Sequence, residues 1–321
     1  ASSPVGLYYR SPEQNAPFVR TVAKAVGCSW AWNVTECMRS RPYTALKVVD
    51  IAPEYLFHLH SPCDGCDNIL PWLPVVDGSV LPVSPVDAFR SGTHHKVPTI
   101  ISTTRNETLA FVPTLLREAA DNILGYELSM RVLFNGLASE VKRHYAKSPD
   151  MAEVRDRVTL VGVASTDALM TCYSRYVVKL LSQYAPAFLS TFMLPVTSSE
   201  MHQDSVCVRG PPEGACCHAA DLAYQLPHSA RMTQRDGVAY NGPEEFRAAL
   251  SYTAALIGFA YGSSGPFVPY TSSSDVSIQW NSGGVSRTSG YHKDHCDLLE
   301  SIGFVDAPWG GDQGRASSIF L

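Results

Sequence analysis

Several segments of the chain repeat apolar side chains at the three- and four-residue spacing of a helix. The first, residues 11–27, opens with Ser-Pro-Glu-Gln, a capping pattern, and stops at Gly27. Further segments with this spacing or with helical start signals lie at residues 127–145, 167–184, 243–261 and 295–302. These segments are predicted to be helices.

Short apolar runs predict buried strands at residues 97–102, 187–194 and 276–280. Strands that alternate with long helices indicate an α/β architecture with a largely parallel sheet. Three or four strands are few for 321 residues. Interior parallel strands need neighbours on both edges, so we expect this chain to hold only part of a sheet.

Two stretches lack any periodic pattern and are predicted to be loops. Residues 53–84 are rich in proline, and residues 198–229 carry Cys, Gly and Pro throughout. Neither stretch has the composition of a linker, and no internal repeat is present. We therefore expect residues 1–321 to belong to a single domain.

Composition narrows the function classes. The chain is 45% hydrophobic and 17% charged, which excludes intrinsic disorder, and its formal net charge is -5. Lys and Arg are scattered singly, so no nucleic-acid partner is expected. The apolar stretch 248–261 is too short and too polar to span a bilayer, so no membrane span is expected.

Nine cysteines are many for a cytosolic protein of this size. Two glycosylation sequons, Asn33-Val-Thr and Asn106-Glu-Thr, accompany them. Together these features favour a secreted protein, or one in the secretory lumen or at the cell surface. Asn33 is the expected glycan site, because a glycan on Asn106 would obstruct the residues discussed next.

Six segments in a fixed order carry a family resemblance. They are L-P-V-V-D-G with L-P at 73–82, R-S-G with K-V-P at 90–98, T-R-N-E-T-L-A-F at 104–111, C-H-A-A-D-L-A-Y at 217–224, F-A with G-P and P-Y at 259–270, and H-C-D-L-L at 295–299. In this order they resemble the type-B carboxylesterase and cholinesterase family of α/β-hydrolases. The resemblance implies the C-terminal part of that fold, with a mostly parallel sheet flanked by helices over residues 1–321.

The family hydrolyses carboxylic esters with a Ser-His-Glu triad. The resemblance places the acid at Glu107 and the base at His218. In such a triad the Ser attacks the acyl carbon, the His carries its proton, and the acid orients the imidazole. His228 is a nearby alternative for the base. No cofactor or metal is expected for this chemistry.

The nucleophile of the triad has no match, because the sequence contains no G-x-S-x-G segment. Gly262-Ser-Ser-Gly265 is one residue short of that pattern. In the family, the serine and the oxyanion glycines lie upstream of the region that matches this chain. We therefore expect a separate or missing N-terminal chain or segment to carry the Ser and to complete the sheet, so that this chain alone is inactive.

Three departures from the family pattern lie near the expected site. Thr108 follows the acid and Ala219 follows the histidine, where the family usually has Gly. Cholinesterases have an aromatic residue three positions after the acid, but Ala110 stands there. Phe111, the next residue, is expected to line the substrate pocket, and specificity for choline esters is not expected.

The resemblance also implies two disulfides, Cys28–Cys37 and Cys172–Cys296. The pairing of the other five cysteines stays open; these are Cys63, Cys66, Cys207, Cys216 and Cys217. His58, His60, Cys63 and Cys66 have a spacing that could bind zinc, although a disulfide fits a secretory protein better.

Other polar residues have weaker assignments. Asp167 matches a family position at the start of a helix, where a role near the site and a role beside the helix dipole are equally open. The histidine pairs 94–95 and 292/295 are expected at the surface.

Two functions of different classes fit the sequence. The first is one part of a two-chain serine carboxylesterase, which the presence of both Glu107 and His218 favours. The second is a non-catalytic cholinesterase-like module for adhesion or assembly, which Thr108 and Ala219 favour. The sequence upstream of this chain would distinguish the two, since only the enzyme needs the nucleophilic Ser.

Overall fold

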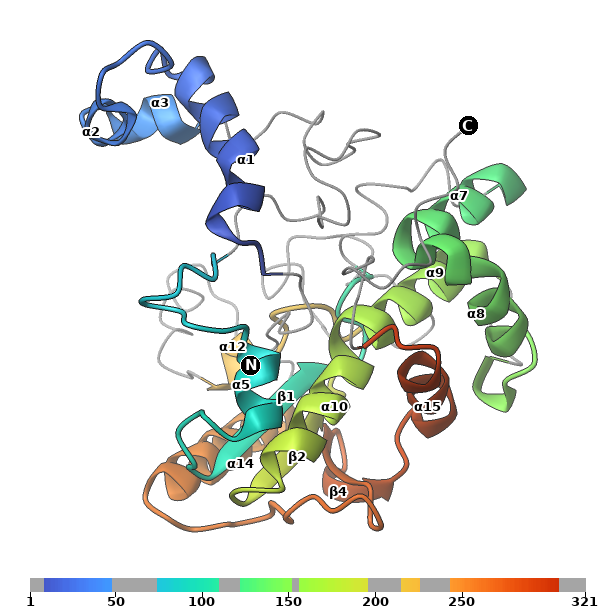
Figure 1. Cartoon of the computed structure of the whole chain (residues 1–321). Coiled ribbons are helices and arrows are strands. Elements are labelled where there is room, and N and C mark those ends of the chain that lie inside the picture. Colours follow the sequence, from blue (N-terminus) through green and yellow to red (C-terminus); the bar gives the residue numbers. More distant parts are fainter. Residues whose placement is uncertain are drawn as a thin grey trace. The chain divides into compact units, whose positions relative to one another are not determined.

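The computed structural model describes residues 9–47, 74–109, 122–151, 156–195, 215–225 and 243–305 (Figure 1). The chain divides into two compact units, residues 89–306 with 1–6 and residues 7–88 with 307–321. The larger unit holds the sheet and both residues of the expected site. That residues 1–321 belong to a single α/β-hydrolase domain stays a prediction.

The larger unit is built on a four-stranded sheet in the order β1-β2-β3-β4. The strands are β1 (Thr99–Thr104), β2 (Ala187–Phe192), β3 (Val276–Asn281) and β4 (Gly284–Ser289). The first three are parallel, with Thr99 opposite Ala187 and Leu189 opposite Ser277, and β4 runs antiparallel to β3. The predicted α/β architecture with a largely parallel sheet is therefore confirmed.

The two apolar strands differ in their surroundings. Every residue of β2 is buried between β1 and β3, as its largely apolar sequence predicts. β1 pairs with β2 only, so within the described residues its other edge carries no strand. The amides of Thr99 and Arg105 donate to the carbonyls of Pro186 and Phe192, at the two ends of β2. The direction of the amides alternates along a strand. Those of Ile100 and Ser102 therefore point to the open edge.

The larger unit also contains helices. They are α7 (Ile123–Phe134), α8 (Ala138–Tyr145), α9 (Arg157–Thr166), α10 (Cys172–Leu181), α12 (Leu222–Gln225), α14 (Pro243–Ala260) and α15 (Lys293–Ser301). α10 contacts β1 and β2, and it crosses in front of the strands in Figure 1. α14 contacts β3 and buries Ala249 and Tyr252 against Phe192, Ile278 and Trp280.

Two helical predictions need correction. The segment 127–145 is two helices, because a 3₁₀ turn at Asn135–Leu137 interrupts it at Gly136. The segment 167–184 starts instead with a π-helical turn, Asp167–Thr171, which directly continues α9 into α10. Sequence periodicity does not reveal a π turn, because such a turn is defined by its i→i+5 backbone hydrogen bonds and not by the spacing of apolar side chains.

The smaller unit contains α1 (Pro12–Ala25), α2 (Val34–Arg39), α3 (Tyr43–Lys47) and most of α5 (Pro85–Ser91). The predicted capping box is present at the start of α1. The Gln14 amide donates to Ser11 Oγ at 3.2 Å, and the Ser11 amide donates to Gln14 Oε1 at 2.8 Å. Most of the predicted loop at residues 53–84 lies outside the described residues.

Two disulfides join described residues, and they are the pairs that the resemblance implies. Cys28–Cys37 closes a short loop after α1, and Cys172–Cys296 joins the start of α10 to α15 across 124 residues. Closing the longer loop restricts the unfolded chain more, so the second bond should contribute more stability. No helix within the described residues is both long and apolar enough to cross a membrane.

An ion-pair network lies close to the second disulfide. Arg175 on α10 donates to both oxygens of Asp275, at 2.9 and 2.8 Å, and to Asp297 at 3.0 Å. Asp275 also accepts from Tyr270 at 3.0 Å. Because Arg175 and Asp275 are both buried, neither charge can return to water when its partner is lost.

Arg175→Met should therefore destabilise the larger unit by about 3–5 kcal/mol, since Asp275 would remain buried without its guanidinium. Lys179→Met, one turn further along α10, removes a partly exposed pair with Glu300 and should cost about 1 kcal/mol or less. Urea unfolding of both variants measures the difference. Equal losses of stability would contradict the assignment of Arg175 as a buried structural charge.

Candidate active site

Glu107 lies three residues after β1, in a tight turn that begins at Arg105. Its side chain is fully buried, and the Thr104 amide at the end of β1 donates to Oε1 at 2.5 Å. This backbone donor is one partner of a carboxylate that would otherwise be costly to bury. The end of β1 therefore fixes the position of the acid.

His218 is brought to Glu107 by the segment that precedes it. Residues 106 and 217 form an isolated parallel bridge, in which the Asn106 amide donates to the Cys216 carbonyl at 2.9 Å. The Asn106 side chain returns the contact, because its Oδ1 accepts from the Cys216 amide at 3.2 Å. Two segments 111 residues apart thus lie side by side just beyond the sheet.

Glu107 and His218 form a hydrogen-bonded pair. His218 Nδ1 lies 2.6 Å from Glu107 Oε2, and the imidazole side chain is 32% exposed whereas the carboxylate is fully buried. The hydrogen bond to Glu107 raises the pKa of His218 above its ordinary value, and it outweighs burial, which would lower that pKa. A neutral imidazole that donates from Nδ1 leaves Nε2 free of a proton, as a general base requires.

A third acidic residue stands near this pair. Asp221, three residues after His218, is buried, and burial raises the pKa of its carboxyl above the ordinary range. Its negative charge also raises the pKa of His218, although by less than Glu107 does. Asp221 is one of the residues by which the sequence resembles the family, but the sequence did not indicate its effect on the pKa of His218.

The two substitutions beside the pair have different structural consequences. Thr108 is buried, and its hydroxyl lies 2.9 Å from the Gly162 carbonyl and 3.0 Å from Thr166 Oγ1, so it ties the turn after Glu107 to α9. Ala219 has φ +68°, a left-handed conformation that favours glycine. A non-glycine residue there costs of order 1 kcal/mol.

The cysteines before His218 lie in the core. Cys216 is a buried free thiol that lies 3.2 Å from the Phe192 carbonyl, and burial raises its pKa far above the ordinary value. Cys217 is disulfide-bonded. A thiol in this neutral state is a poor nucleophile.

Several predicted residues lie away from this pair or outside the described residues. Phe111, His228, His58, His60, Cys63 and Cys66 belong to the second group. Asn33 is exposed and caps α2, with its Oδ1 accepting from the Glu36 amide at 3.1 Å. Its Nδ2 is not needed for that cap, and its glycosylation stays a prediction.

Asp167 and the histidines 292 and 295 differ from the sequence prediction. Asp167 is buried in the π-helical turn rather than at a helix start, and both histidines contact its carboxylate. His295 is fully buried, so the prediction of a surface pair is wrong for it. The physical reason is its partner 128 residues earlier, which local sequence cannot reveal.

Comparisons with known proteins match this chain to one family and to parts of two proteins. The profile of the carboxylesterase family matches residues 6–284. The crystal protein of Dictyostelium discoideum is 29% identical over 153 residues, which are 47% of this chain and 26% of that protein. The cAMP-regulated D2 protein of the same organism is 28% identical over 105 residues, which are 33% of this chain and 19% of that protein.

The aligned part thus spans about a quarter or less of each of these relatives. The family match, by contrast, extends over most of the chain and includes both members of the hydrogen-bonded pair. The sheet, the Glu107–His218 geometry and this match together show that the chain belongs to the carboxylesterase family of α/β-hydrolases.

Proposed function

We propose that this chain supplies the acid and the base of a Ser-His-Glu triad in a carboxylic ester hydrolase. The observation that carries the proposal is the 2.6 Å contact between His218 Nδ1 and Glu107 Oε2. In a triad, the acid orients the histidine in this way. Glu107 and His218 lie 111 residues apart, so only the fold can bring them together. Membership of the carboxylesterase family supports the same reaction class.

The proposed chemistry follows from the two ring nitrogens of His218. Nε2 takes the proton of a serine hydroxyl as that oxygen attacks the ester carbonyl, and it later returns the proton to the leaving alcohol. Glu107 keeps the Nδ1 proton in place and stabilises the imidazolium that forms between the two steps. The raised pKa of His218 fits this role, because it strengthens the base.

The nucleophilic Ser and the oxyanion donors belong, in this proposal, to an N-terminal chain or segment. Two observations support it: the sequence has no G-x-S-x-G segment, and β1 has an open edge within the described residues. A strand placed on that edge would satisfy the amides of Ile100 and Ser102. Completing a sheet in this way buries a largely apolar interface of more than about 2,000 Å².

The proposed location is the secretory pathway, the extracellular space or the cell surface. The disulfides Cys28–Cys37 and Cys172–Cys296 support it, because such bonds persist in oxidising compartments. A glycan on Asn33 belongs to the same proposal. The substrate class is a carboxylic ester, and Phe111 is the residue proposed to line its pocket.

One observation favours a second function, a non-catalytic cholinesterase-like module for adhesion or assembly. Ala219 holds a left-handed conformation directly after His218, where the family usually has Gly. A protein released from catalysis can tolerate such a strained residue beside its former base. The two functions differ in one observable, which is whether a serine reacts when His218 is intact.

The pKa of His218 tests the pair itself. Glu107→Gln should lower this pKa, since it removes the largest favourable interaction of the imidazolium. Asp221→Asn should lower it less, because the charge of Asp221 is a smaller cause. NMR titration of the imidazole measures both shifts, and equal pKa values in wild type and Glu107→Gln would contradict the pair.

The same raised pKa predicts how stability depends on pH. A pKa raised by folding stabilises the native state fully below the unfolded-state pKa of about 6.5. This contribution is lost as the pH rises through the folded-state pKa of His218. Glu107→Gln should remove that part of the pH dependence.

A fluorophosphonate probe for activated serines tests the catalytic role in the full-length protein, expressed as wild type and as variants. The probe should label a serine outside residues 1–321, and His218→Gln should slow labelling by about 10³-fold or more. His228→Gln, the alternative base, is the matched control and should label like wild type. Absence of any labelled serine in the wild-type protein would support the non-catalytic module instead.

A further inference from the structure

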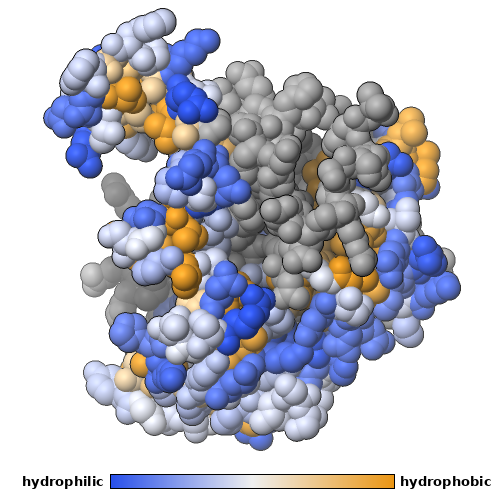
Figure 2. Space-filling view, in the orientation of Figure 1, coloured by the Kyte–Doolittle hydropathy of each residue, from blue (hydrophilic) through white to orange (hydrophobic). Residues whose placement is uncertain are grey.

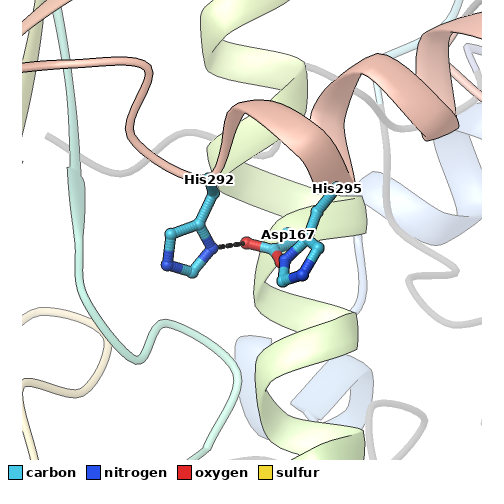
Figure 3. Close-up of side chains that lie close together, drawn as sticks. All are labelled: Asp167, His292 and His295. Carbon is cyan, nitrogen blue, oxygen red and sulfur yellow. Dashed lines mark hydrogen bonds and ion pairs between the residues drawn. The ribbon is translucent and has the colours of Figure 1, made fainter. Parts of the chain in front are cut away.

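A second carboxylate–histidine cluster lies apart from Glu107 and His218. Asp167, His292 and His295 converge, with their potential ligand atoms within 4.8 Å of one another (Figure 3). Asp167 Oδ1 lies 2.6 Å from His292 Nδ1, and Asp167 Oδ2 lies 2.9 Å from His295 Nδ1. The triad chemistry proposed above makes no use of these three side chains.

Covalent and backbone features hold this cluster in place. Asp167 begins the π-helical turn that ends just before Cys172, and His292 and His295 stand at the start of α15, next to Cys296. The Cys172–Cys296 disulfide therefore ties together the two elements that carry the cluster. His292 has φ +51°, and such strain, like a π turn, concentrates at functional sites.

Neighbouring side chains orient the cluster from outside. Ser148 Oγ lies 2.9 Å from His295 Nε2, and the Tyr145 hydroxyl donates to Asp167 Oδ2 at 2.8 Å. The Tyr145 ring stacks on His295 with centroids 4.1 Å apart. Histidines that bind metals show this arrangement, in which one ring nitrogen faces the ion and a polar group holds the other.

An orphaned polar atom lies beside the same rings. His144 stands edge-to-face against His295, with ring centroids 5.6 Å apart, and its Nε2 is buried without a hydrogen-bond partner among the described residues. A buried polar atom that lacks a partner calls for an explanation, and a bound water or ion is one that fits beside these side chains. This observation is independent of the three converging side chains.

We propose that Asp167, His292 and His295 bind a divalent transition-metal ion, with Zn²⁺ as the ion that best fits two imidazole nitrogens and one carboxylate. Three protein ligands leave a fourth tetrahedral position for water. Bonds of about 2.0–2.1 Å hold the ligand atoms roughly 3.3 Å apart, so the side chains need to shift only slightly. His292, the most exposed of the three, has the freedom to do so.

Binding requires each imidazole to present a lone pair at Nδ1. The proton that Nδ1 donates to Asp167 in the hydrogen-bonded cluster moves to Nε2 of the same ring. For His295, Ser148 Oγ is already placed to accept from Nε2. The metal then takes the place of the two protons that the histidines donate to Asp167. The buried carboxylate of Asp167 supplies the negative charge that a cation needs.

Zn²⁺ titration of the chelator-treated protein by isothermal calorimetry tests the proposal. Wild type should bind one equivalent at this site, with a Tm that rises as Zn²⁺ is added. His292→Gln should abolish this equivalent, because Gln binds metals poorly. The Gln side chain can still donate to Asp167, so the hydrogen bond is kept. Ser148→Ala should weaken the binding about tenfold.

Matched controls distinguish this site from the other histidines. His94→Gln, at a histidine well away from the cluster, should bind Zn²⁺ like wild type. The double variant His58→Gln/His60→Gln should also keep the equivalent, which separates the cluster from the other zinc-like spacing in the chain. Co²⁺ in place of Zn²⁺ should give visible absorption bands that Asp167→Asn removes, so the result does not depend on stability alone.

Two results would overturn the proposal. The first is a wild-type protein that binds no Zn²⁺, which would make the cluster a hydrogen-bonded network only. The second is a His292→Gln protein that retains folding, judged by circular dichroism, and binds Zn²⁺ with unchanged affinity. Neither result would affect the proposed esterase function, because Glu107 and His218 take no part in this site.

Discussion

The buried carboxylate of Glu107 is the constraint on which the expected site depends. An ionised carboxylate without exposure to water is stable only when donors surround it. Here one oxygen accepts from the Thr104 amide and the other meets His218 Nδ1. The position of His218 is therefore set by the end of β1, and β1 is in turn aligned by its pairing with β2. A change in this register would move the acid and the base together.

Among the described residues of the larger unit, two buried carboxylates, those of Glu107 and Asp167, contact imidazole nitrogens, and the two sites differ in their surroundings. His218 is 32% exposed, so its ring can meet a reacting group. His295 is fully buried and its Nε2 is occupied by Ser148. The exposed ring of the first pair fits the proposed general-base role, whereas the His295 ring is closed to solvent and lies beside the Cys172–Cys296 disulfide. Burial of the histidine, more than its distance from the acid, makes the difference.

Local patterns predicted much of this structure from the sequence. The capping box at Ser11 and the apolar run of β2 depend on neighbouring residues, and both formed as expected. The family resemblance predicted that Glu107 contacts His218, which no local sequence pattern could have indicated. β4 was missed because its residues are mostly polar, although Gly283-Gly284, at the turn that leads into it, is a hairpin signal. The burial of His295 depends on Asp167, so only the fold could reveal it.

Hydrogen exchange along β1 tests most directly whether this chain holds part of a sheet that another segment completes. Amides that point to β2, such as those of Ile101 and Thr103, should be protected in residues 1–321 alone. Those of Ile100 and Ser102, on the open edge, should exchange rapidly in this chain and become protected in the full-length protein. Equal protection of all four amides in the chain alone would contradict the account.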